Sequence, residues 1–228
     1  MDGGAPWDDN GRMPDQPVPD ALTLQSLPLF PLGTVLFPGG VLPLRIFEVR
    51  YLDMIRRCQR TGSPFGVVSL REGHEVRQAG APQESFNTVG TLAHLTEVES
   101  PQPGLLMIRA EGRQRFRIQR SEQLKHGLWV ADVELVADDQ AVTVPEDLEE
   151  TSTALHRVLD TLKARADAVG GELPVTEPWQ LRDCAWVANR WSELLPLPSE
   201  LKQRLMELDN PVVRLELVGD LLARHRIG

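Results

Sequence analysis

The chain has 228 residues, of which 41% are hydrophobic, and it carries a formal net charge of −9. This length predicts one large domain or two modest ones, with enough apolar side chains to bury a core. The acidic balance argues against broad, non-specific attraction to nucleic acid or to an anionic membrane.

The cysteines and the first twenty residues indicate the compartment. Cys58 and Cys184 lie far apart, and neither has a CxxC motif or a Cys/His cluster beside it, so neither a disulfide framework nor a zinc site is predicted. The first twenty residues have no basic start and no apolar run, unlike a signal peptide or a membrane anchor. No later run approaches the roughly 20 apolar residues that span a bilayer. We therefore expect a cytoplasmic protein without a metal or a cofactor.

The N-terminal half changes character near residue 24. Residues 1–23 are rich in Asp, Gly and Pro, which predicts a disordered tail in which Trp7 alone could dock onto another surface. Residues 24–138 consist of short β-branched or alternating runs bounded by Gly, Pro or Asn, a pattern typical of an all-β unit. The strand candidates are 35–37, 41–47, 65–70, 88–98, 104–110, 114–120 and 129–136.

One helix is predicted inside this β unit. In the run VRYLDMIRRCQRTG, apolar residues recur at helical spacing from Tyr51 to Cys58, and Gly62 ends the run. Proline is confined in sheets to edges, strand starts and bulges. Because Pro31, Pro38 and Pro43 crowd the preceding segment, we expect short, bent strands in a closed or nearly closed barrel.

The last part of the chain, residues 139–228, has helical periodicity. Thr143 to Glu146 has the spacing of a capping box, and the helix that follows ends at Gly170-Gly171. A second helix is predicted after Thr176, with Pro178 in its first turn and a stop at Pro196. Two shorter helices are predicted over 199–208 and from Asn210-Pro211 onward. These helices predict a small C-terminal bundle.

Searches for catalytic motifs found none. The chain has three lysines, Lys125, Lys163 and Lys202, and each follows a leucine, so no GxxxxGK[ST] phosphate loop is present. There is no GxSxG elbow. His74-Glu75 lacks the second histidine of HExxH and is interpreted as part of a solvated loop. We expect a protein that is not an enzyme.

An arginine stripe extends from Arg109 to Arg120 through RQRFRIQR. Alternation places Phe116 and Ile118 on one face and Arg115 and Arg117 on the other. The favoured interpretation is an amphipathic strand whose polar face meets solvent. The alternative is a surface that contacts RNA, which would need aromatic side chains free to stack on bases.

Two further features have both a structural and a binding interpretation. Glu48-Val49-Arg50-Tyr51 stands at a strand-to-helix junction, where a network of caps and ion pairs is favoured over the rim of a partner site. Trp186 falls off the apolar stripe of its predicted helix. An exposed Trp186 would be a contact anchor, and core packing is the equal competitor.

The order and spacing of several segments resemble the N-terminal domain of the Lon proteases. The stretch 27–51, LPLFPLGTVLFPGGVLPLRIFEVRY, is similar to its opening, although this chain has Val49 where the family often has proline. The likeness continues through FGVV at 65–68, VGTLAHLTEVE at 89–99, IRAEGRQRFRI at 108–118 and LLPLPSELKQRLMELDNPVVRLELVGDLL at 194–222. It covers nearly everything from residue 24 to 228.

The resemblance implies an α+β protein: an N-terminal PUA-like β pseudo-barrel over 24–138 with one inserted helix, followed by a helical bundle over 139–228. It also implies a polypeptide-recognition module without the ATPase and peptidase parts of Lon. The expected partners are unfolded or extended polypeptides, or a separate protease or chaperone for which the chain is an adaptor. We expect an apolar groove between barrel and bundle, and exposed edge and groove residues at Phe37, Pro38, Arg45, Phe47, Arg50, Tyr51 and Trp186.

Overall fold

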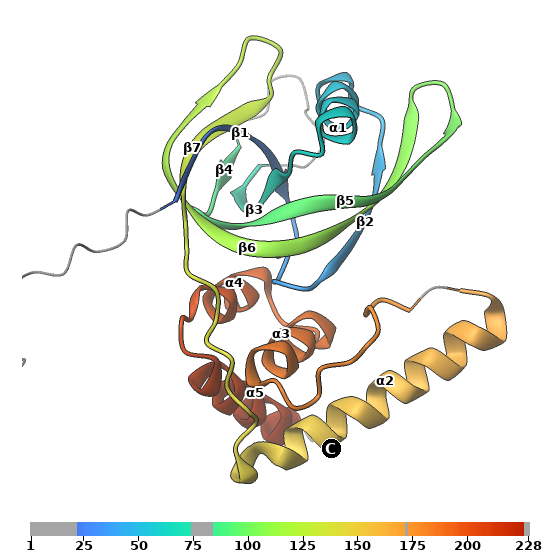
Figure 1. Cartoon of the computed structure of the whole chain (residues 1–228), viewed down its shortest axis with the longest axis vertical. Coiled ribbons are helices and arrows are strands. Elements are labelled where there is room, and N and C mark those ends of the chain that lie inside the picture. Colours follow the sequence, from blue (N-terminus) through green and yellow to red (C-terminus); the bar gives the residue numbers. More distant parts are fainter. Residues whose placement is uncertain (1–21, 74–83, 172, 226–228) are drawn as a thin grey trace, which may run out of the picture.

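The computed structural model describes residues 22–73, 84–171 and 173–225. Most of the predicted tail, with Trp7, and the predicted loop histidine His74 lie outside these ranges. The strands and helices fall into two parts of the molecule, and all seven strands lie in the first (Figure 1). The structure is therefore a mixed α+β protein with a mainly sheet N-terminal region.

The N-terminal part is one sheet that closes on itself. Its strand order is β1-β7-β6-β5-β3-β4, and a parallel pairing between β1 and β3 completes the ring, while β2 pairs with β6 outside this path. The strands are β1 (Thr23–Leu32), β2 (Val41–Ile46), β3 (Phe65–Glu72), β4 (Ser85–Phe86), β5 (Val89–Gln102), β6 (Leu105–Gln123) and β7 (Trp129–Leu135).

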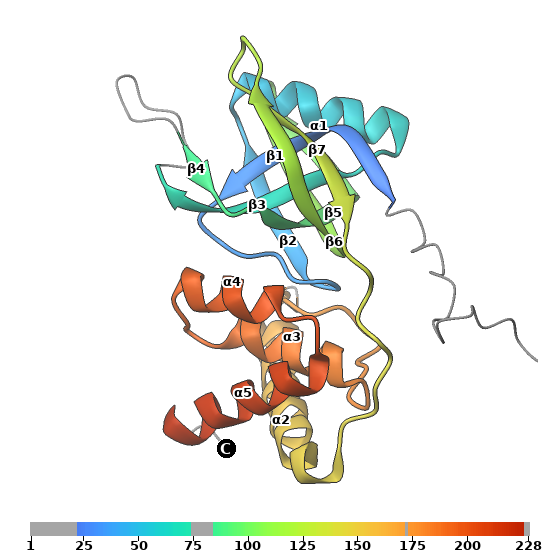
Figure 2. The ribbon, with the colours of Figure 1, turned by 90° about the vertical axis from the view of Figure 1, so that its left-hand side faces the viewer.

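The inserted helix, α1 (Val49–Thr61), is the one that the sequence predicts. It buries Tyr51, Met54, Ile55 and Cys58, the residues that recur at helical spacing, against the core of the sheet. Gly62 ends the helix in the left-handed conformation, with φ 66°, which glycine adopts without a steric penalty. α1 therefore covers one open side of the closed sheet (Figure 2).

The strand predictions need four corrections, of which one is the short strand β4, which was not predicted. The first strand, β1, was not predicted, because Pro28 and Pro31 obscure its alternation. Residues 35–37 are buried but lie in an irregular segment, so that strand prediction was wrong. The two strands expected at 104–110 and 114–120 are one continuous strand, β6, which runs through Gly112. β1 begins at Thr23, so the predicted tail, residues 1–23, overlaps the first residue of this strand.

Pro43, the proline of β2, fits the sheet without loss of a ladder bond. Gly112 N donates to Gly40 O at 2.8 Å, and in an antiparallel pair hydrogen-bonded positions alternate. The even-numbered positions of β2 therefore pair with β6. Pro43, opposite Arg109, belongs to the other set, whose backbone groups point away from β6, so its missing N–H costs no ladder bond.

The C-terminal part is helical. Its elements are a short 3-10 helix (Glu146–Leu148), α2 (Glu149–Val169), α3 (Cys184–Leu194), α4 (Ser199–Glu207) and α5 (Pro211–His225). Helices α2, α3 and α5 share one buried cluster that includes Leu155, Trp191 and Leu215, whereas Leu205 and Met206 of α4 pack against the N-terminal part. The long helix α2 extends beyond the others, and α4 lies next to the sheet (Figures 1 and 2).

Two helix starts differ from the sequence prediction. Thr143 forms an isolated bridge with Asp183 rather than a capping box, and α2 has no side-chain cap. The peptide bond before Pro178 is cis, and the helix begins later, where Asp183 Oδ1 accepts from Trp186 N at 2.7 Å. The predicted start at Thr176 was therefore wrong. The ends at Gly170 and before Pro196, and the starts of α4 and α5, are confirmed.

Candidate functional site

The structure divides the seven predicted binding residues between core and surface. Phe37, Arg50 and Tyr51 are 0%, 6% and 3% exposed, so their prediction as exposed edge and groove residues was wrong. Phe37 packs with Leu205 and Met206 of α4. Tyr51 stacks on Phe30, with ring centroids 3.9 Å apart. Sequence alternation alone could not show that these aromatic rings pack between elements that are distant in the sequence.

Arg50 is the centre of a buried ionic network. Its Nη1 donates to Gly127 O at 2.8 Å, and its guanidinium lies 3.2 Å from Glu48 Oε2 and 3.4 Å from Glu84 Oε1. Trp129 Nε1 also donates to Glu84, at 3.0 Å. The network ties the start of α1 to the turn between β6 and β7. These contacts agree with the structural interpretation of the Glu48–Tyr51 junction.

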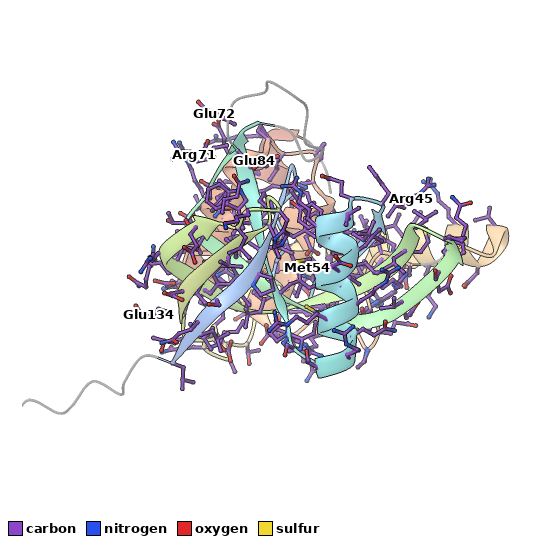
Figure 3. The ribbon with its side chains drawn as sticks, turned by 90° about the horizontal axis from the view of Figure 1, so that it is seen from above. Arg45, Met54, Arg71, Glu72, Glu84 and Glu134 are labelled. Carbon is purple, nitrogen blue, oxygen red and sulfur yellow. The ribbon has the colours of Figure 1, made fainter. Side chains whose placement is uncertain are left out.

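Arg45 and Phe47 remain on the surface, and the structure adds two neighbours. Arg45 is exposed and lies opposite Met107 in the β2–β6 pair. Phe47 is 56% exposed, Val49 72% and Met107 38%. Arg45 and Phe47 are two positions apart along an extended segment and so share a face. We call these four residues the β2 patch; Arg45 is labelled in Figure 3, beside the β5–β6 hairpin.

The β2 patch adjoins an open strand edge. Among the described residues β2 pairs with β6 alone, so its second edge has no strand partner. An open edge presents unpaired backbone groups to which an extended chain can add. Val49 and Met107 were not predicted as site residues. Alternation between buried Leu106 and Ile108 was the signal that could have identified Met107.

Pro38 and Trp186 line one cavity between the sheet and the helices, and both are half-buried. The cavity has a volume of about 520 Å³. Charged and amide side chains dominate its walls: Glu111, Arg113, Gln114, Arg115, Asp138, Asp139, Gln180, Asp183 and Asn189. The groove at this place is therefore mixed in character rather than the apolar one that was expected, because the two parts of the molecule meet here through ion pairs.

The arginine stripe is interrupted at its centre. Arg115 is 3% exposed, and its Nη1 donates to Met206 O at 3.0 Å while its Nη2 lies 3.0 Å from Asp139 Oδ1. Burial lowers the pKa of Arg115 against the opposing effect of Asp139. Asp139 also pairs with Arg214 of α5 at 2.7 Å. The prediction that Arg115 faces solvent was therefore wrong, because this side chain joins β6 to the helices.

Two members of the stripe, Arg109 and Arg113, face carboxylates. Arg109 lies 3.7 Å from Glu97, and Arg113 lies 2.9 Å from Glu111. Phe116 is fully buried and Ile118 is packed against the same cluster, as the alternation predicts. No ring of the stripe is therefore available for base stacking.

A second ionic group holds the Pro38–Gly40 turn. Arg190 of α3 donates through Nη2 to Pro38 O at 3.0 Å and through Nη1 to Gly39 O. Its Nε lies 2.9 Å from Glu193 Oε2. A Cβ on Gly40 would lie 2.0 Å from Glu193 Oε1, so only glycine fits this position without a shift of the carboxylate. The Pro38–Gly40 turn therefore redirects the chain into β2 and is also the surface on which α3 packs.

In the described ranges, no three or more His, Cys, Asp or Glu side chains are grouped so that they could hold a metal ion. Burial raises the pKa of the Cys58 thiol and raises that of Cys184 to about 11, which keeps both in the protonated, less nucleophilic form. No helix in the described part of the chain is long and apolar enough to cross a membrane.

Comparison with known proteins identifies the family. The model of the ATP-dependent protease La (LON) substrate-binding domain matches residues 26–224. The chain therefore belongs to the LON substrate-binding domain family, as the sequence resemblance indicated.

Relatives and solved structures agree with this assignment. The chain is 30% identical to a Lon protease of Anaeromyxobacter dehalogenans over 88% of its own length, but it spans only 23% of that protease. A Lon N-terminal domain protein from Xanthomonas campestris has a similar structure, with a TM-score of 0.64, 34% identity, and coverage of 88% of this chain and 98% of that one. The N-terminal domain of a Mycobacterium avium complex Lon protease, at 18% identity, has a TM-score of 0.58 over 88% of this chain and 100% of that one, and shows the fold alone.

Proposed function

We propose that the chain is a non-catalytic module that binds extended or unfolded polypeptide segments. Membership of a substrate-binding domain family supports this function. The observation that carries it is the β2 patch, an exposed apolar surface beside an open strand edge. We further propose that the closed sheet is a PUA-like pseudo-barrel, that α2–α5 form a bundle, and that the protein acts in the cytoplasm.

The open edge of β2 determines how a peptide would bind. An extended peptide can add to β2 through main-chain hydrogen bonds, which depend little on its sequence. Phe47, Val49 and Met107 then add apolar contact area, at roughly 25 cal/mol per Å² buried. Because main-chain hydrogen bonds depend little on the sequence of the peptide, the expected affinity is weak and tolerant of sequence. Such binding suits recognition of unfolded clients, for this chain alone or as an adaptor for a separate protease or chaperone.

The test is anisotropy of a labelled, permanently unfolded polypeptide titrated with the protein at low and moderate salt. Phe47→Ala should weaken binding by roughly fivefold or more, because an exposed aromatic anchor carries a large share of such an interface. Leu217→Ala, at a residue that is 42% exposed on α5, is the matched control and should leave affinity unchanged. Equal binding by wild type and a folded Phe47→Ala variant would remove the β2 patch from the proposal.

A labelled RNA hairpin tests the alternative in the same experiment. Binding to RNA through the arginine stripe would fall steeply with salt because it displaces counterions from phosphates. Saturable polypeptide binding that survives added salt, with no RNA binding, supports the proposed function. Salt-sensitive RNA binding without polypeptide binding would contradict it.

A further inference from the structure

A separate cavity of about 460 Å³ lies between β1 and α1. Figure 3 shows α1 alongside β1, with Met54 on the side of the helix toward the strand. Arg45, also labelled in Figure 3, lies on the other side of α1 in this view. Apolar residues from three elements form its floor: Leu24, Leu27, Pro28, Met54, Cys58, Leu124, Leu128 and Val130. The volume is that of an ordinary ligand pocket and accommodates a large apolar side chain.

An unpaired strand edge runs along this cavity. β1 pairs with β7 from Thr23 to Leu29, but β3 borders its other edge only from Leu29 to Leu32. Among the described residues, 23–28 have no strand on that second side, and Leu24 to Pro28 line the cavity. The chain just before β3, at Ser63 and Pro64, lines it too. The cavity therefore occupies the place where a longer β3 would continue beside β1.

This geometry favours an extended polypeptide as the occupant. A strand added beside β1 would pair with the edge of residues 23–28 that faces no strand among the described residues, and alternate side chains would point toward the apolar floor. The bulge between Leu24 and Leu27 interrupts the β1–β7 register at the same place. Bulges are common where an edge bends away from regular pairing.

Charged side chains at the rim of the cavity favour a ligand of opposite charge. Arg57 and His126 line it and are exposed. Asp53, the one carboxylate among the lining residues, lies 3.8 Å from Arg56, which offsets its charge. Arg50 is already engaged by Glu48 and Glu84. In a chain of net charge −9, this rim is locally cationic and complements an acidic ligand.

We propose that this cavity between β1 and α1, which we call the β1–α1 cleft, is a second polypeptide subsite. It takes an extended acidic segment with one large apolar side chain. The apolar side chain fills the cavity between Met54 and Leu128, and flanking carboxylates face Arg57 and His126. This inference rests on the proposed function and names the class of segment that the module prefers.

The test uses labelled Gly-Ser peptides with a central Asp-Trp-Asp, Lys-Trp-Lys or Asp-Gly-Asp sequence. Wild type should bind the Asp-Trp-Asp peptide best, because only this peptide has both an apolar side chain for the floor and carboxylates for the rim. Arg57→Glu should weaken that binding by roughly fivefold at low salt, the effect of reversing one rim charge. Arg60→Glu makes the same charge change at an exposed position of α1 outside the cavity lining and should change affinity by less than about twofold.

Ser63→Trp provides an independent steric test. Ser63 is exposed at the mouth of the cavity, so a tryptophan there should block the cleft and abolish binding of the Asp-Trp-Asp peptide, with far-ultraviolet circular dichroism confirming the fold. Equal affinity for the Asp and Lys peptides, or peptide binding unaffected by both Arg57→Glu and Ser63→Trp, would overturn the inference.

The two proposals fail in different ways. If the unfolded polypeptide binds and depends on Phe47, but the Asp-Trp-Asp peptide does not bind, the second subsite is wrong and the proposed function stands. If neither the unfolded polypeptide nor any peptide binds, the proposed function itself is wrong.

Discussion

At the scale of single residues, buried charges are stable here because each has several partners. Arg50 contacts two carboxylates, one carbonyl and the face of Tyr51, whose ring centroid lies 4.5 Å from its guanidinium. Removing one member of a buried pair leaves the other charge without compensation, which costs more than the pair contributed. Arg50 therefore supports the orientation of α1, which separates the β2 patch from the β1–α1 cleft.

Arg50→Met should lower the free energy of unfolding by about 3 kcal/mol, because Glu84, with a side chain 10% exposed, loses its cation. Urea denaturation followed by circular dichroism measures this change. Arg56→Met is the matched control: its pair with Asp53 is 3.8 Å long and exposed, so a change within about 0.5 kcal/mol is expected. Equal effects of the two substitutions would show that the buried network does not stabilise α1.

At the scale of elements, α3 contacts the turn at Pro38–Gly40, which leads into β2. Arg190 donates to two successive carbonyls of Pro38 and Gly39, and Lys202 of α4 donates to Glu193 O at 2.8 Å. Burial raises the pKa of Glu193 from its ordinary 4.5 to about 7, although Arg190 and Lys202 act to lower it. The contact between α3 and the turn therefore depends on pH.

The sign of this dependence follows from linkage. The folded protein holds the Glu193 proton more tightly than the unfolded chain, so this contribution to stability is fully present below pH 4.5 and is lost as the pH rises through about 7. Glu193→Gln should remove that loss, roughly 3 kcal/mol between these limits.

Urea midpoints at several pH values between 4.5 and 8 check this prediction. Glu200→Gln, at an exposed position of α4, should retain the wild-type pH profile. A Glu193→Gln profile that matches wild type would mean that the Glu193 carboxyl titrates alike in the folded and unfolded chains.

The elements also show how far sequence reasoning extends. Helix α1 was predictable because its spacing, from Tyr51 to Cys58, and its glycine stop are local signals. The start of α3 was not, because Pro178 resembles a first-turn proline whereas the cap is made by Asp183. Phe47 was a correct surface prediction, but the burial of Phe37 depends on α4, far along the chain. Contacts between distant segments leave no local pattern.

At the scale of the whole molecule, one carboxylate pairs with an arginine from each of the two parts. Asp139 lies 3.0 Å from Arg115 of β6 and 2.7 Å from Arg214 of α5, and these arginine side chains are 3% and 1% exposed. Arg214 also donates to Asn189 Oδ1 of α3 at 2.8 Å. Through Asp139, three elements from both parts are connected in one buried network.

Asp139→Asn should therefore destabilise the protein by about 3 kcal/mol, because two buried guanidinium groups lose their shared anion. Hydrogen exchange measured by mass spectrometry in urea should show α3 and α5 losing protection before the sheet, whereas in wild type both parts lose it together. Asp138→Asn changes the exposed neighbour and should leave the exchange pattern intact. Simultaneous exchange in the Asp139→Asn variant would show that other contacts suffice to couple the parts.

The closure of the sheet by its first strand has a consequence for synthesis on the ribosome. β5, β6 and β7 follow one another and pair as neighbours, whereas β1 must find β7 through pairs such as Leu29 with Trp129. Chain segments emerge in order, at about 5–20 residues per second, so most of the N-terminal part has left the ribosome before β1 can pair with β7. During that interval the nascent chain exposes the apolar residues of β1 and is itself an unfolded polypeptide of the kind that this family of domains is proposed to bind.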